Sequence, residues 1–244
     1  NGICFIIPGM RGADASHEEI ERIKALYYGE VTFLDKWVGH LLNKIEQLNL
    51  EDDTVVQVLS DHGTQVMDHG SFGKGGENVR GYNTGIVWQM RIPGRQPRSI
   101  DALVQSHNVM PTLLDILDIP FARAEGESVM PLIDGKQDAL RTPIVNGWAQ
   151  FAQGNAKAFA SVRSKEWNYI TPVHNEPETP PRLFDLRNDP DENEDVSNTS
   201  PEVCRELQQH VEALTGQPLP AVMNEACDQG EPPMVTYLKN SRHT

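Results

Sequence analysis

Residues 54–74, TVVQVLSDHGTQVMDHGSFGK, decide the fold prediction for this chain. The segment opens with four aliphatic residues that a single glutamine interrupts, VVQVL at positions 55–59. A dense β-branched run without strict alternation is typical of a short strand buried on both faces, as parallel strands are in an α/β sheet. The sequence therefore predicts a buried parallel strand that ends near Leu59.

Asp61 and His62 follow this strand at the position where α/β sheets bind ligands, just beyond the carboxyl end. Their oxygen and nitrogen donors suit a divalent metal. Gly63 permits a positive φ, which would let the two neighbouring side chains converge. Lys74, on a glycine-rich segment, adds a cation. Metal ligands combined with a lysine are what binding of a doubly charged oxyanion requires.

A simpler interpretation of the same residues remains open. Asp-His-Gly after a strand also forms ordinary turns, in which Asp61 bonds its own backbone and His62 is exposed. In that case Lys74 would be a solvated surface lysine. The two interpretations differ in whether these three side chains converge.

The motifs SDHG and HGSFGK, with Lys74 thirteen positions after Asp61, resemble the second-half signature of the sulfatase family within the alkaline phosphatase superfamily. Four more segments resemble family segments in the same order: YYGEVTFLDKWVG at 27–39, PTLLDIL at 111–117, GESVMPL at 126–132 and LFDLRNDPDE at 183–192. The resemblance covers about residues 23–197. It implies a sulfuric ester hydrolase that acts on aryl or carbohydrate sulfates, and its family leans towards periplasmic, secreted or lysosomal proteins.

The resemblance also assigns roles to individual residues. Asp61 and His62 would supply part of the coordination of one divalent cation, most often Ca²⁺. Lys74 would hold a sulfate oxygen and stabilise charge in the transition state. Apart from the resemblance, the position of His69 beside Gly70 suits either proton transfer or a hydrogen bond that braces the loop, and we favour bracing.

The family's nucleophile is a hydrated formylglycine made from a Cys or Ser in a C/S-x-P-x-R motif, and this sequence contains no such motif. Two ligands are also too few for Ca²⁺, which takes about six to eight oxygens. We therefore expect the chain to be the C-terminal half of a sulfatase that is inactive alone. Two alternatives are a phosphodiesterase or phosphonate monoester hydrolase of the same superfamily, and a non-catalytic oxyanion-binding domain.

Composition limits the remaining possibilities. The 244 residues, of which 38% are hydrophobic, can form one sizeable core or a core with a small satellite. A formal net charge of −14 argues against partners such as nucleic acids and anionic membranes. No run approaches the roughly eighteen apolar residues of a membrane span.

The three cysteines, Cys4, Cys204 and Cys227, form no CxxC pair, and a disulfide between Cys204 and Cys227 remains one possibility. Oligomeric state cannot be predicted.

Helical signals surround the central segment in this first part of the chain. Ser16 and Glu19 form a capping box before a periodic apolar stripe, which predicts a helix over residues 17–48 that packs against the sheet. Residues 84–90 predict a second strand and residues 104–117 a helix. We expect Glu77 and Arg80 to form surface ion pairs. We expect His107 to be exposed or to cap the helix that follows it.

A shift in composition near residue 136 predicts a boundary between residues 1–136, part of a sulfatase-like α/β catalytic domain, and a small α+β subdomain at 137–244. Short strands are predicted at 143–145, 158–163, 167–170 and 182–186, and a helix at 201–215. The acidic segment 189–195 predicts a solvated surface loop. The fold class is thus α/β, with part of a mostly parallel sheet flanked by helices, plus a small C-terminal antiparallel sheet with one helix.

Overall fold

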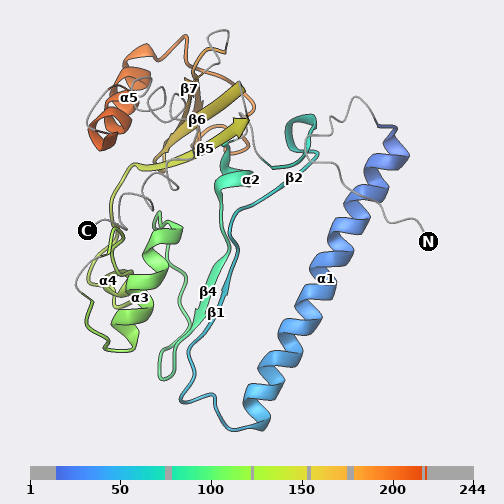
Figure 1. The fold of residues 1–244 in the computed structure, drawn as a ribbon, viewed down its shortest axis with the longest axis vertical. Coiled ribbons are helices and arrows are strands. Elements are labelled where there is room, and N and C mark those ends of the chain that lie inside the picture. The colour runs from blue at the N-terminus through green and yellow to red at the C-terminus, as the bar shows by residue number, and fades with distance from the viewer. Residues whose placement is uncertain are drawn as a thin grey trace. The chain divides into compact units, whose positions relative to one another are not determined.

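The computed structural model describes residues 15–74, 79–121, 124–152, 155–174, 179–215 and 218 (Figure 1). The chain forms two compact units that alternate along the sequence. Unit 1 consists of residues 1–74 and 82–99, and unit 2 consists of residues 75–81 and 100–244. In these units the chain crosses from one unit to the other more than once, whereas the sequence predicted a single boundary near residue 136. That boundary stays a prediction.

The helix predicted for residues 17–48 is confirmed as α1, His17–Gln47. The Ser16 hydroxyl accepts a hydrogen bond from the Glu19 backbone N–H at 3.3 Å, and the Glu19 carboxylate accepts one from the Ser16 backbone N–H at 2.8 Å. This reciprocal pair satisfies two backbone donors that have no partner within the helix. Its hydrogen bonds hold the pKa of the Glu19 carboxyl below the usual value. Asn49, with a φ of 54°, turns the chain away after the helix.

The apolar stripe of α1 is only partly covered, whereas the prediction was that it packs against the sheet: Ile20, Tyr27, Val38 and Ile45 are half-buried, and Val31, Leu34, Leu41 and Leu48 are exposed. Ile23 is buried, whereas Phe33, Leu34 and Trp37 are 59%, 62% and 56% exposed. We use the name apolar face of α1 for the exposed apolar residues of the helix and its C-cap, Leu26, Val31, Phe33, Leu34, Trp37, Leu41 and Leu48. Periodicity shows that a helix face is apolar but does not show what covers it.

The strand predicted before Asp61 is β1, Val56–Leu59, and it pairs with β4, Trp88–Arg91, in antiparallel orientation. Val58 and Leu59 are 36% and 39% exposed. The prediction of a parallel strand buried on both faces is therefore wrong for the described residues, because an aliphatic run does not specify its neighbouring strands. The second predicted strand begins later than residue 84, since residues 81–84 form the short helix α2, Gly81–Thr84.

The predicted C-terminal antiparallel sheet with one helix is confirmed. Its strands, in the order in which they pair, are β5 (Ile144–Ala152), β6 (Asn155–Arg163), β7 (Trp167–His174) and β8 (Arg182–Asp185). Helix α5, Pro201–Thr215, buries Leu207 and Val211, which lie four residues apart on one helix face. They pack against β6 and β7 residues of the same core, including Val162 and Tyr169. The overall class is mixed α/β, as predicted.

A buried threonine organises the segment between strands β4 and β5. Helix α3, Val109–Ile116, starts later than predicted because residues 106–108 form a 3₁₀ turn. The Thr112 hydroxyl is fully buried, donates to the Asn108 carbonyl at 2.6 Å and accepts from the Val129 N–H at 2.9 Å. The second of these bonds fixes the entry to helix α4, Met130–Ile133.

Glu192 is buried, contrary to the prediction that residues 189–195 form a solvated surface. Its carboxylate accepts hydrogen bonds from Arg163 Nη1 at 2.6 Å, Asn168 Nδ2 at 2.8 Å and the Gly81 backbone N–H at 3.0 Å. We call these four residues the Glu192 cluster. A buried carboxylate persists when its charge is paired and its oxygens are hydrogen-bonded.

Arg80 is also buried, so the prediction of a surface ion pair is wrong for this residue. It is 8% exposed, and its guanidinium carbon lies 4.7 Å from the centroid of the Phe184 ring. A guanidinium over an aromatic face is attracted by the ring quadrupole. Glu77 lies outside the described residues. The charges of Arg80 and Glu192 thus face partners that are distant in sequence.

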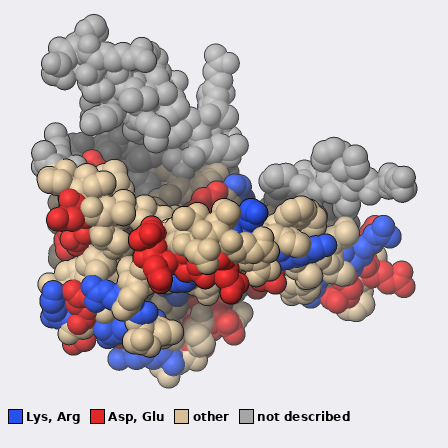
Figure 2. Space-filling model, turned by 90° about the horizontal axis from the view of Figure 1, so that it is seen from below, with Lys and Arg blue, Asp and Glu red and all other residues tan. Residues whose placement is uncertain are grey.

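Charged side chains are spread over the surface. On the face shown in Figure 2, Lys and Arg are interspersed with Asp and Glu. The described helices include none that is both long and apolar enough to cross a membrane. Because the formal net charge is −14, attraction of an anionic substrate requires a local cationic group.

Stability should fall at alkaline pH because of Tyr169. Burial raises the pKa of this phenol above its ordinary value of 10.0. Above about pH 10 the unfolded chain ionises while the folded chain does not, so the free energy of unfolding decreases until the folded pKa is reached. Urea unfolding of the wild type and of Tyr169→Phe between pH 9 and 11.5 measures this. The variant should lose less stability over this range, and identical losses would contradict the prediction.

Candidate functional site

Asp61 and His62 are held in unit 1 by hydrogen bonds of the residues on both sides of the pair. On one side, the Ser60 N–H donates to the Val87 carbonyl at 3.0 Å, and the Val87 N–H donates to the Ser60 hydroxyl at 2.8 Å. These bonds extend the pairing of β1 with β4 up to the residue before Asp61. On the other side, the Gly63 N–H donates to the Asn83 carbonyl at 2.9 Å. The backbone of the Asp-His pair is therefore fixed at both ends.

Gly63 is required for a reason other than the predicted positive φ. A Cβ atom at this position would lie 2.0 Å from the Tyr82 carbonyl oxygen. The absence of a side chain allows this close approach of two backbone segments. The approach permits the Gly63–Asn83 hydrogen bond described above.

A small hairpin returns Lys74 to the Asp-His pair. Strand β2, Gln65–Val66, pairs with β3, Phe72–Gly73, and Lys74 follows β3 directly. The intervening turn contains left-handed conformations at Met67 and Gly70, with φ of 77° and 74°. Phe72 is 2% exposed and anchors the returning strand. The eleven residues between His62 and Lys74 are thus closed into a compact loop.

The three predicted side chains converge. Lys74 Nζ lies 2.6 Å from His62 Nε2, and Asp61 Oδ2 lies 3.4 Å from the same nitrogen. The other ring nitrogen, Nδ1, lies 2.6 Å from the Gly63 carbonyl oxygen. The alternative in which Asp61, His62 and Lys74 point apart does not describe this structure.

These contacts define the tautomer of His62. A carbonyl oxygen only accepts hydrogen bonds, so Nδ1 carries the proton and donates to Gly63. Nε2 then presents its lone pair, which accepts from the Lys74 ammonium. The 3.4 Å contact between Asp61 Oδ2 and Nε2 is an ion pair only when the imidazole is protonated. Orientation of an imidazole by a backbone carbonyl at Nδ1 leaves Nε2 as the coordinating atom.

The site is open to solvent. The side chain of Asp61 is 85% exposed, that of His62 is 36% exposed, and Lys74 is also exposed. Water therefore screens the attraction between these groups. The three side chains therefore point to one place, but the described residues do not shield that place from water.

The donor set fits part of a metal site. Asp61 offers a carboxylate oxygen and His62 offers an imidazole nitrogen with a fixed lone pair, both ordinary ligands of divalent cations. Among the described residues, no group of three or more His, Cys, Asp or Glu side chains is placed to hold a metal ion. The two residues thus suit a partial coordination shell, and their metal role stays a prediction.

His69 packs against Tyr82 in a nearly parallel arrangement. The ring centroids are 5.3 Å apart with an interplanar angle of 29°. His69 itself adopts a left-handed conformation, with a φ of 49°. A stacked ring in the turn between β2 and β3 is compatible with the bracing role, while proton transfer by His69 stays a prediction. Sequence reasoning missed Tyr82, for which no local signal exists.

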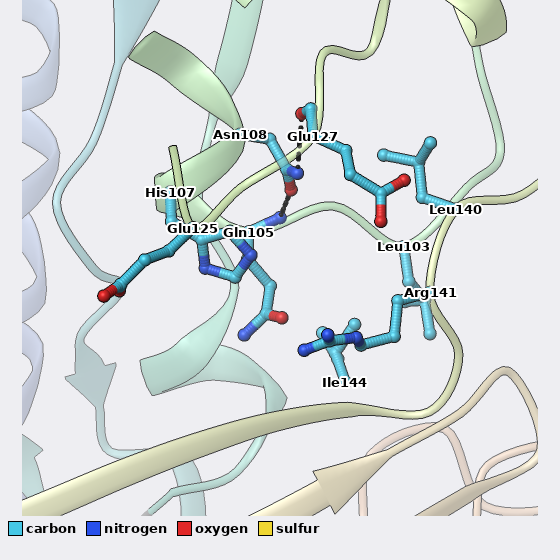
Figure 3. Close-up of a pocket in the computed structure, with 9 residues that line it drawn as sticks. All are labelled: Leu103, Gln105, His107, Asn108, Glu125, Glu127, Leu140, Arg141 and Ile144. Carbon is cyan, nitrogen blue, oxygen red and sulfur yellow. Dashed lines mark hydrogen bonds between the residues drawn. The ribbon is translucent and has the colours of Figure 1, made fainter. Parts of the chain in front are cut away.

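A separate pocket lies in unit 2 and contains none of the predicted site residues (Figure 3). It is lined by Leu103, Gln105, His107, Asn108, Glu125, Glu127, Leu140, Arg141 and Ile144. Asn108 connects its walls, because its amide accepts from the Gln105 N–H at 2.7 Å and donates to the Glu127 carbonyl at 2.9 Å. His107 is exposed, as predicted. The two hydrogen bonds of Asn108 therefore connect the backbone at Gln105 with the backbone at Glu127.

Two protein families match the sequence. The family described as Sulfatase matches residues 9–119, and the family described as N-sulphoglucosamine sulphohydrolase, C-terminal, matches residues 77–217. The second match covers more than half of the chain. Asp61, His62, His69 and Lys74 all lie within the first match.

Curated relatives agree with these families. The chain is 28% identical over 208 residues to arylsulfatase K of Gallus gallus and 29% identical over 209 residues to arylsulfatase K of Homo sapiens. Each match covers 82% of this chain and 38% of the relative. It is also 28% identical over 197 residues to the multifunctional alkaline phosphatase superfamily protein PehA of Trinickia caryophylli, covering 74% of this chain and 37% of the relative.

Solved structures share the fold. The phosphonate monoester hydrolase of Agrobacterium radiobacter superposes with a TM-score of 0.72 at 23% identity, covering 82% of this chain and 42% of that one. A protein solved in complex with its substrate D-glucosamine-2-N,6-O-disulfate superposes with a TM-score of 0.64 at 20% identity, covering 77% and 39%. The chain spans less than half the length of these relatives and structures.

Proposed function

Because the chain belongs to the sulfatase family of the alkaline phosphatase superfamily, we propose that it supplies part of the active site of a sulfuric ester hydrolase. The observation that carries this proposal is the convergence of Asp61, His62 and Lys74, with Lys74 Nζ 2.6 Å and Asp61 Oδ2 3.4 Å from His62 Nε2. Metal-ligating donors beside an ammonium form the constellation that a sulfate dianion or its ester requires.

Each residue has a distinct part in this proposal. Asp61 and His62 hold a divalent cation, with Ca²⁺ as the expected ion. When bound, the cation acts as a Lewis acid towards sulfate oxygens. Lys74 binds another oxygen of the sulfate group and stabilises the negative charge that develops there. His69, stacked on Tyr82, keeps the β2–β3 turn in place.

We place the nucleophile outside this chain. No Cys or Ser in the sequence is followed by Pro and Arg in the C/S-x-P-x-R arrangement. Formylglycine and the remaining metal ligands would then come from polypeptide that the matched relatives contain beyond the 38% covered here. This proposal explains why only two ligands converge among the described residues.

The apolar face of α1 supports the same proposal. Soluble proteins rarely expose contiguous apolar patches of this kind unless they mark a contact surface. Leu34, Trp37 and Leu41 are more than half exposed on one side of a single helix. The remaining part of a sulfatase domain is a polypeptide of suitable size to cover them.

The substrate class is proposed from the relatives. Two of them are arylsulfatases by name, and one solved structure holds a sulfated glucosamine as its substrate. We therefore propose an aryl or carbohydrate sulfate for this protein. The alternative is a phosphodiesterase or phosphonate monoester hydrolase of the same superfamily, the superfamily that the name of PehA gives and to which the Agrobacterium radiobacter phosphonate monoester hydrolase adds a structure of the same fold.

The 244-residue chain alone should hydrolyse no aryl sulfate in the presence of Ca²⁺, because nucleophile and ligands are missing. The product of a longer gene that contains this sequence, produced with its formylglycine, should hydrolyse the same substrate. Both are assayed with 4-nitrocatechol sulfate, sulfated glucosamine and phenyl phosphonate. Turnover by the short chain that disappears in Asp61→Ala would contradict the incomplete site, and a preference of the long protein for the phosphonate would select the alternative function.

A further inference from the structure

We propose that the buried Glu192 is a positioning residue for the Asp61–His62 pair and that helix α2 transmits its effect. The Glu192 carboxylate accepts a hydrogen bond from the Gly81 N–H at 3.0 Å, where α2 begins. Two residues later in the same helix, the Asn83 carbonyl accepts a hydrogen bond from the Gly63 N–H at 2.9 Å. The inference rests on the proposed function for the role of the pair, and it adds a residue distant in the sequence to those that hold the pair in place.

The first argument is how firmly Glu192 holds the start of α2. The first N–H groups of a helix have no partner within the helix, so the Gly81 N–H needs an outside acceptor. Glu192 is 2% exposed, and Arg163 and Asn168 donate to its carboxylate at 2.6 and 2.8 Å. A Cβ atom on Gly81 would lie 3.0 Å from Arg163 Nη2 and 3.1 Å from Glu192 Oε1. The backbone at the start of α2 therefore lies directly against a buried ion pair.

The second argument is that α2 contacts both segments that form the candidate site. The Gly63 backbone packs so closely on the Tyr82 carbonyl that a Cβ atom on Gly63 would lie 2.0 Å from its oxygen. The Gly63 carbonyl in turn orients the His62 ring through Nδ1 at 2.6 Å. The Tyr82 ring also stacks on His69, in the turn that precedes β3 and Lys74. A displacement of α2 would therefore move the group that orients His62 and the turn that returns Lys74.

The third argument is the short connection between the two hydrogen bonds. Each contact lies within one unit, and the chain passes from unit 2 to unit 1 between Gly81 and Tyr82. Only the backbone of residues 81–83 separates the N–H that Glu192 holds from the carbonyl that holds Gly63. A helical turn fixes its backbone dihedrals, so a segment of this length absorbs little displacement. Loss of the Glu192 contact should therefore loosen the Gly63 hydrogen bond as well.

The experiment measures the rate at which the Gly63 amide of the 244-residue chain exchanges its hydrogen for deuterium, by NMR at constant pH. Labelling with carbonyl-¹³C histidine and ¹⁵N glycine selects the glycines that directly follow a histidine, and in this sequence these are Gly63 and Gly70. His69→Gln removes the Gly70 signal from this pair and thereby assigns the Gly63 signal. Uniform ¹⁵N labelling gives the exchange of the β6 and β7 amides, which reports the stability of the C-terminal sheet.

Glu192→Ala should accelerate exchange of the Gly63 amide by about tenfold to a hundredfold, the effect of losing a hydrogen bond to a charged group. Glu192→Gln can still accept from the Gly81 N–H, so it should restore most of the protection and leave an acceleration of about fivefold. Leu207→Ala is the control, because Leu207 packs α5 on the C-terminal sheet. It should accelerate exchange of the β6 and β7 amides and leave the Gly63 rate within about twofold of the wild type.

A Gly63 rate that Glu192→Ala leaves unchanged would overturn the proposal. Equal acceleration of Gly63 by Leu207→Ala would also overturn it, because the effect would then follow from lost stability alone. If Glu192→Ala does not fold, the comparison of Glu192→Gln with Leu207→Ala decides in the same way. These rates need no turnover, so a longer protein that hydrolyses no sulfate ester would count against the proposed function and not against this coupling.

Discussion

Lys74→Met in a longer sulfatase that contains this sequence should reduce turnover of an aryl sulfate by about 10²- to 10³-fold, the usual effect of losing one preorganised donor to a developing oxyanion. The lysine follows β3 directly and reaches the position of His62 Nε2, so no other described cation replaces it there. Most of the loss should appear in kcat, because the charge on the sulfate oxygens develops in the transition state.

Steady-state kinetics at saturating Ca²⁺ measure this effect. Lys136→Met is the matched control, since Lys136 is exposed and bonds to Asp134 at 2.9 Å. Its kcat should stay within twofold of the wild type. A Lys74→Met enzyme with wild-type kcat would remove Lys74 from the chemistry and leave it a surface residue. A raised KM with unchanged kcat would limit it to substrate binding.

Glu192→Ala should destabilise the folded chain by about 3–5 kcal/mol, the effect of breaking a buried ion pair on one side. The substitution removes the acceptor for Arg163, Asn168 and the Gly81 N–H at once. Arg163 would keep a charge that is largely withdrawn from water, with a side chain 21% exposed. Unsatisfied donors in a buried site add their own desolvation cost.

Urea unfolding of the wild type and the variant measures this difference. Glu194→Ala is the matched control, because Glu194 is exposed in the same loop and should change stability by no more than about 0.5 kcal/mol. Equal stabilities of Glu192→Ala and Glu194→Ala would show that the Glu192 cluster contributes nothing measurable. If Glu192→Ala does not fold, Glu192→Gln replaces it. The amide oxygen of Gln can still accept from Arg163 and from the Gly81 N–H, so this variant should lose less stability, by an amount that urea unfolding can measure.

Local patterns in the sequence predicted the local structure well. The capping box at Ser16 and Glu19 marked the start of α1, and the periodicity of residues 201–215 gave α5 its bounds. The Asp-His pair and Lys74 were predicted to meet, and they do so because a two-residue hairpin pairing closes the loop between them. These features depend on neighbours within about fifteen residues.

Features that depend on distant partners could not be predicted. Charge patterns suggested solvent for Arg80 and Glu192, whereas the structure buries these two side chains against β6, β7 or β8 residues and leaves the rest of the 189–195 segment mostly exposed. The aliphatic run of β1 and the stripe of α1 indicated burial, but neither pattern contains information about the covering element. The sequence patterns therefore identified which residues are apolar, but they did not identify which elements cover those residues.

The group that orients the His62 ring is a main-chain carbonyl, at Gly63. One mutation would remove a side-chain acceptor, whereas every amino acid supplies a main-chain carbonyl. The orientation of the His62 ring should therefore tolerate substitutions at neighbouring positions. The tolerance ends at Gly63 itself, where the Tyr82 backbone leaves no room for a methyl group. Directed evolution of this loop should therefore vary its surroundings freely and leave that single codon untouched.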